Sequence, residues 1–117
     1  MSSLSRPERV AKQLREEISQ IMLRDMKDPR VRMASVSAVN VSPDLRNARV
    51  RISSLADDEE RQLVLAAMRH AEGFVRHLLR DRLDNLRTIP RLVFELDESI
   101  AYSVRISSML KEMQETP

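Results

Sequence analysis

The chain lacks cysteine and has one glycine, two phenylalanines and one tyrosine among its 117 residues. The absence of cysteine excludes disulfides and thiolate metal sites. A loop that cradles phosphates needs several glycines, so Walker and Rossmann loops are also excluded. The serines lack the surroundings of a nucleophile elbow. These absences indicate a protein that is not an enzyme and that has no cofactor.

Long apolar runs are missing as well. The longest uncharged stretch, Met33 to Pro43, is too short to span a bilayer. Charged residues come early, at Arg6, Glu8 and Arg9, where a signal segment would be apolar. We therefore expect a cytoplasmic monomer that does not contact membranes. The length predicts one domain, over residues 1–113, with a frayed tail at 114–117.

Arginine dominates the basic residues: 17 of the 20 are arginine and three are lysine. The net charge is only +2, but residues 1–56 carry eleven basic against six acidic side chains. Guanidinium groups hold phosphates through paired hydrogen bonds, so local basic stripes could attract a polyanion. The excess of arginine could equally reflect the codon usage of a GC-rich genome.

Periodicity and turn chemistry predict the order helix, strand, strand, helix, kink, helix, strand, with a weak final helix. Ser5 and Asp57 or Asp58 have the chemistry of helix caps, and the alternation slips near Ala38, which suggests a bulge. This order predicts an α+β fold with helices on one face of a three-stranded sheet. The expected helices cover residues 6–26, 58–86 and 99–113, and the expected strands cover residues 31–42, 48–53 and 91–96.

Gly73 is the only glycine, and it lies inside a helical pattern that runs from Leu63 to Leu86. Glycine in a helix interior costs about 1 kcal/mol relative to alanine. We expect it to mark a kink or a close approach of another backbone, from a packed helix or from a ligand. We also expect both phenylalanines, Phe74 and Phe94, in the core, which leaves no exposed aromatic platform for stacking bases.

Basic residues gather around this position. Arg69, Arg76, Arg80 and Arg87 are spaced 7, 4 and 7 residues apart, which keeps them within about 40° on an ideal helix. They could hold phosphates, or they could form an ordinary solvated face. Weaker candidates are Arg49 and Arg51 on the outer face of a strand, Arg6 and Arg9 near the start, and Arg30.

Five segments, in order over nearly the whole chain, resemble the bacterial ribosome-binding factor A family. They are Arg6–Val10, Lys27–Arg30, Val36–Leu45 with Ala48, Ala71–Arg76, and Leu86–Phe94. The resemblance implies a KH-like fold of type II connectivity. It also implies that the GxxG loop of ordinary KH domains is replaced by a kink at Ala-x-Gly, matched here by Ala71, Glu72 and Gly73.

The resemblance further implies binding to the free 30S ribosomal subunit and its 16S rRNA. It implies a role in late subunit maturation, including processing of the 16S 5′ end, and in growth in the cold. Some members carry a long charged C-terminal tail that we do not see here.

Three other interpretations remain open from the residues. The leading one is a protein-interaction module that docks through the kinked basic helix without contacting RNA. A DNA-binding domain is less favoured. A metal-dependent enzyme that uses His70, His77 and Asp81 is weaker still, because a metal site would want tighter spacing.

Overall fold

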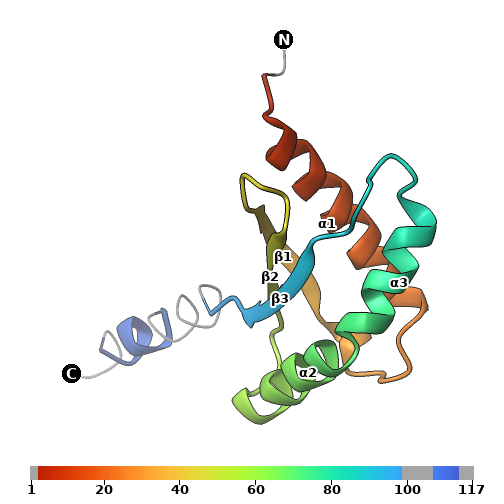
Figure 1. The fold of residues 1–117 in the computed structure, drawn as a ribbon. Helices are drawn as coiled ribbons and strands as arrows, with labels where there is room; N and C mark the ends of the chain where they lie inside the picture. Colours follow the sequence, from red (N-terminus) through yellow and green to blue (C-terminus); the bar gives the residue numbers. More distant parts are fainter. Residues whose placement is uncertain (1–2, 99–106, 114–117) are drawn as a thin grey trace.

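The computed structural model describes residues 3–98 and 107–113 of the chain (Figure 1). Its elements follow in the predicted order. They are α1 (Arg6–Arg24), a short 3-10 helix η1 (Val31–Met33), β1 (Ser35–Val41), β2 (Asn47–Ser53), α2 (Asp58–His70), α3 (Glu72–Arg82) and β3 (Arg91–Leu96). Residues 107–113 are also helical. Ser99, the predicted cap of that helix, lies outside the described residues, as does the tail at 114–117.

Helix α1 begins as its sequence predicts. The side chain of Ser5 accepts a hydrogen bond from the amide of Glu8 at 3.2 Å, and Pro7 lies in the first turn, where no backbone donor is needed. Its buried stripe consists of Val10, Leu14, Ile18, Ile21 and Met22. The helix ends at Arg24, two residues earlier than predicted.

The segment after α1 differs from the prediction of a strand beginning at Val31. Residues Val31–Met33 form a 3-10 helix instead, and the strand begins at Ser35. The cause is local, because the carboxylate of Asp28 accepts the amide of Arg30 at 2.9 Å, and the Asp28 carbonyl accepts the amide of Val31 at 3.1 Å. Asp followed by Pro favours such a turn over an extended strand.

The sheet has the order β1-β2-β3. β1 runs antiparallel to β2, while β3, which returns after the helices, runs parallel to it. The predicted bulge is present, one residue before the expected slip: Val36 pairs with Ile52 but Ala38 pairs with Arg51, which leaves Ser37 as the extra residue.

The core lies between one face of this sheet and the helices. Alternate residues of β2 (Ala48, Val50 and Ile52) and of β3 (Leu92 and Phe94) are buried. The intervening residues lie on the opposite face, where Arg49 and Val93 are exposed and Arg51 is half-buried. Helices α1, α2 and α3 therefore cover one face of the sheet, as predicted (Figure 1).

Helix α3 ends at Arg82, four residues before the predicted end at Leu86. Leu83 leaves the helical conformation, with φ −116° and ψ 75°. Both Leu83 and Ile89 are buried in the core. Burying both side chains requires the chain to turn back toward β3, and this tertiary requirement overrides the helical pattern of the sequence.

Candidate nucleic-acid interface

The predicted kink is present, and it lies at Ala71. α2 ends at His70, and Ala71 takes up φ −89° and ψ 7° before α3 begins at Glu72. The amide of Ala71 still donates to the carbonyl of Ala67 at 3.0 Å, and its own carbonyl accepts from Val75 at 2.9 Å. The two helices therefore remain joined by hydrogen bonds while changing direction (Figure 1).

Gly73 is not needed for this change of direction. It lies inside the first turn of α3 and has no positive φ. Apart from its chain neighbours and the adjoining backbone of its own helix, a Cβ placed on it would meet no described atom within 4 Å. The kink predicted over Ala71–Gly73 is present, but the backbone angles change at Ala71 rather than at Gly73. No packed helix approaches Gly73, so close packing does not explain the glycine. What remains is open space beside an N-terminus of α3 that has no side-chain cap.

Two side chains beside the break bond to the outer edge of β3, the edge that does not pair with β2. The carboxylate of Glu72 accepts the amide of Leu92 at 3.1 Å, and Arg69 Nε donates to the carbonyl of Phe94 at 3.2 Å. Glu72 also forms an ion pair with Arg76 at 3.3 Å. The break is thus fixed to the sheet on both sides, and Arg69 and Arg76 each hold a structural partner.

Arg80 and Arg87 are exposed, and neither has a polar partner among residues 3–98 and 107–113. Arg87 does not extend the helical line predicted from its spacing, because α3 ends at Arg82 and Arg87 lies in the loop that follows. Both guanidinium groups keep their full set of donors available for a ligand.

The weaker basic candidates differ in their contacts. Arg6 is exposed and has no polar partner within the described ranges. Arg9 donates to the carbonyl of Leu4 at 2.8 Å. Arg30 binds both oxygens of Asp28, at 3.1 and 3.0 Å, and these side-chain hydrogen bonds, with the one from the Arg30 amide, hold the pKa of Asp28 below its usual range.

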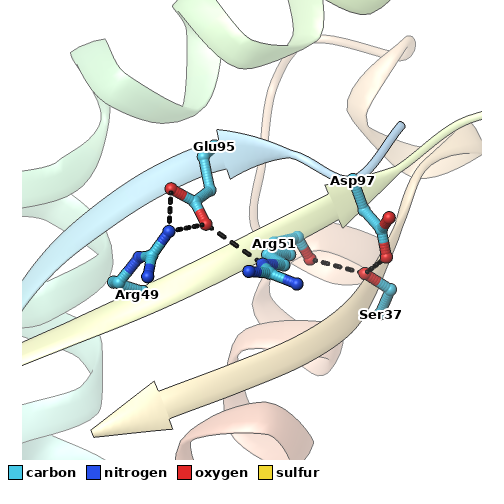
Figure 2. A network of polar contacts seen from close by, with 5 residues as sticks. All are labelled: Ser37, Arg49, Arg51, Glu95 and Asp97. Atoms are coloured by element: carbon cyan, nitrogen blue, oxygen red, sulfur yellow. Dashed lines mark hydrogen bonds and ion pairs between the residues drawn. The ribbon is translucent and has the colours of Figure 1, made fainter. Parts of the chain in front are cut away.

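The open face of the sheet carries its own charge network (Figure 2). Glu95 accepts hydrogen bonds from Arg51 Nε at 3.1 Å and from Arg49 at 2.9 Å. The hydrogen bond from Arg51 and then the one from Arg49 lower the pKa of Glu95. Beside them, the hydroxyl of Ser37 in the bulge lies 2.6 Å from a carboxylate oxygen of Asp97, to which it donates. Arg49 and Arg51 are therefore already engaged by an acid of the same chain.

This network predicts a pH-dependent stability. The pKa of Glu95 is lower in the folded than in the unfolded protein. The ionised carboxylate therefore adds to the free energy of unfolding above its unfolded-state pKa, and this stabilisation is lost as the pH falls through its folded-state pKa. We expect Glu95→Gln to lower the melting temperature at about pH 7 and to make a much smaller difference at about pH 3. Thermal unfolding of both proteins at the two pH values measures this. An equal difference at both values would contradict a role for the ionised carboxylate.

Phe74 is not in the core as predicted; the residue is 47% exposed, whereas Phe94 is buried as predicted. The apolar pattern from Leu63 to Leu86 was read with one helical period across the predicted kink, whereas the break at Ala71 changes which side of α3 faces the sheet. Val75 and Leu79 are buried in its place. In α2, likewise, Leu63 of the predicted stripe is 40% exposed. The buried residues there are Arg61, Val64, Leu65 and Met68.

Phe74 lines a groove of about 460 Å³ between the end of α1 and the break. Ala67, His70 and Ala71 contribute from the helices, and residues 25–28 contribute from the opposite side. Most of this lining is apolar. Sequence reasoning missed the groove because it joins segments far apart in the chain, and because it placed Phe74 in the core.

His77 lies 3.8 Å from Asp81, one turn along α3. Among the described residues, no three side chains of the His, Cys, Asp or Glu type gather closely enough to hold a metal ion. Within the same ranges, no helix combines the length and the apolar character needed to cross a membrane.

The chain is similar to known proteins in both sequence and fold. A ribosome-binding factor A from Caldanaerobacter subterraneus subsp. tengcongensis is 38% identical over 109 residues, which cover 92% of this chain and 88% of that protein. The crystal structure of ribosome-binding factor A from Thermus thermophilus matches with a TM-score of 0.67 and 25% identity, covering 79% of this chain and 97% of that one.

Coordinates of the Thermus thermophilus factor fitted into a cryo-EM map of its complex with the 30S subunit match with a TM-score of 0.63 and 26% identity. They cover 75% of this chain and 91% of that one. The structural matches confirm the predicted KH-like α+β fold. The family model for ribosome-binding factor A matches residues 6–110. With that span and the relative above that is 38% identical, the chain belongs to the ribosome-binding factor A family.

Proposed function

We propose that this protein binds the free 30S subunit through 16S rRNA and assists the late maturation of that subunit. The proposal includes processing of the 16S 5′ end, support of growth in the cold, a cytoplasmic location and action without catalysis. Family membership supports it, as does the 30S complex of the Thermus thermophilus relative.

The observation that carries the RNA contact is the open N-terminus of α3. Gly73 is exposed there with no neighbour within 4 Å of a Cβ, and no side chain caps the helix. The first turn of a helix presents backbone donors and the positive end of the helix dipole, both of which favour a phosphate. A phosphate backbone could approach this turn more closely at glycine than at any other residue.

Arg80 and Arg87 would bind neighbouring phosphates, since neither has a polar partner among the described residues. Arg69 and Arg76 would add contacts through the donors that their structural partners leave unused. Such a surface recognises backbone and shape rather than base sequence. Binding that favours one rRNA conformation over another is sufficient to guide maturation, because a ligand shifts an equilibrium by its difference in affinity for the two states.

Co-sedimentation of the purified chain with isolated 30S and 50S subunits tests this function. We expect binding to free 30S subunits and much weaker binding to 50S subunits. The 30S affinity should fall linearly on a log-log plot against salt concentration, because Arg–phosphate contacts release counter-ions. Partial RNase digestion of the bound 30S particles should release the protein. A complex that survives both salt and RNase would instead favour the protein-interaction module.

A further inference from the structure

The groove beside the helix break has the composition of a site for a flat apolar group. Its lining includes Met26, Ala67, Ala71 and Phe74, and Phe74 is 47% exposed. Its volume of about 460 Å³ falls within the usual range of small-ligand pockets. An aromatic ring left this exposed in a domain with a complete core is available for stacking on a partner.

The charges at the rim favour an occupant that carries a negative group. Both carboxylates there are bound by arginines of the same chain: Asp25 by Arg82 at 2.8 Å, and Asp28 by Arg30 at 3.0 Å. Lys27 also lines the groove, is exposed, and has no polar partner among residues 3–98 and 107–113. The free charge of the rim is therefore positive.

We propose that this groove takes one unpaired nucleobase of an RNA strand, stacked on Phe74, with the adjoining phosphate held by Lys27. This inference rests on the proposed function, and it specifies that the groove beside the break binds a single unpaired nucleotide of the RNA. A nucleotide combines a flat base having apolar faces with an attached anion, so it matches both the walls and the rim. An apolar peptide side chain would fill the walls but would leave the charge of Lys27 unmatched.

Binding of the full chain to two RNAs of equal length and charge tests the proposal. One is a single-stranded oligouridine, and the other has the same sugar-phosphate backbone without bases. We expect the wild type to bind the oligouridine more tightly. Phe74→Ala should weaken oligouridine binding about five- to thirty-fold, leave binding of the abasic strand unchanged and preserve the salt slope, because stacking contributes without releasing counter-ions.

Controls separate stacking from folding and from general loss of apolar surface. Phe74→Trp should restore the preference for the oligouridine, since it keeps an aromatic face. Leu63→Ala removes a side chain of α2 that is 40% exposed and outside the groove, and it should leave both affinities unchanged. Photocrosslinking of wild-type protein to a 5-iodouridine-substituted strand gives a second measurement that needs no variant, and the crosslink should map to Phe74.

Each contrary result overturns the inference in an identifiable way. If the wild type binds both RNAs equally, or if the crosslink maps away from the groove, the base site is wrong while the proposed function stands. If the wild type binds neither RNA nor 30S subunits, both fail. If Phe74→Ala weakens 30S binding but affects neither oligonucleotide, the groove takes a ribosomal protein instead of a base.

Discussion

Replacing Arg80 and Arg87 together by glutamate is expected to weaken 30S binding by about a hundredfold. Each substitution removes a cation that lacks a polar partner among the described residues and places an anion where phosphate should lie. Folding should change little, since both side chains are exposed. The slope of log affinity against log salt should also become shallower by about two phosphate contacts. Co-sedimentation over a salt series measures both quantities.

The pair Arg80 and Arg87 is preferable to Arg76 with Arg80. Arg76 is paired with Glu72, whose carboxylate also accepts the amide of Leu92, so reversing Arg76 would disturb the fold as well as the surface. Arg15→Glu with Arg32→Glu is the matched control, because it changes the net charge by the same amount at two exposed positions on α1 and η1. Equal loss in both double variants would mean that net charge, rather than this surface, governs binding.

Gly73→Gln is expected to raise the stability of the protein and to lower its affinity for the 30S subunit. No atom lies within 4 Å of a Cβ at this position, and the backbone is already helical, so a good helix former should stabilise the protein by up to about 1 kcal/mol. The same side chain would fill the space through which a phosphate backbone approaches, and 30S affinity should fall about tenfold or more. Thermal unfolding and co-sedimentation provide the two readings.

Gly73→Ala is the graded control for that substitution. It adds a single methyl group, so it should give most of the stability gain with a smaller loss of affinity. Unchanged 30S affinity in the glutamine variant would remove the first turn of α3 from the interface. A loss of stability in both variants would contradict the structure, in which Gly73 needs neither special backbone angles nor close packing.

Local sequence chemistry was sufficient to predict helices α1 to α3, the three strands and their order, but not the 3-10 helix η1. The cap at Ser5, the cap at Asp57, the alternation of β2 and the bulge in β1 all follow from interactions within a few residues or between strands joined by a short turn. The break between α2 and α3 was also predicted. The family resemblance implied its position at Ala71–Gly73, and the structure has it at Ala71, but the end of α3 at Arg82 was not predicted, because packing against the sheet decides it.

The chemistry of the candidate site was less accessible to sequence reasoning. The partners of the arginines lie far away in the chain: Arg49 binds Glu95, and Arg69 donates to the carbonyl of Phe94. Local spacing does not distinguish arginines that have such partners from Arg80, which has no polar partner among the described residues. Phe74 was assigned to the core for a related reason, because a helical pattern read across a break assigns the wrong face.

The attachment of the break to β3 also has a consequence for aggregation. An unpaired strand edge offers backbone donors and acceptors to which a strand of another molecule can add. Here Glu72 occupies the amide of Leu92, and Arg69 occupies the carbonyl of Phe94. The residues that fix the helix interruption thereby obstruct this edge, and they protect a crowded, concentrated solution of the protein from intermolecular β-pairing along β3.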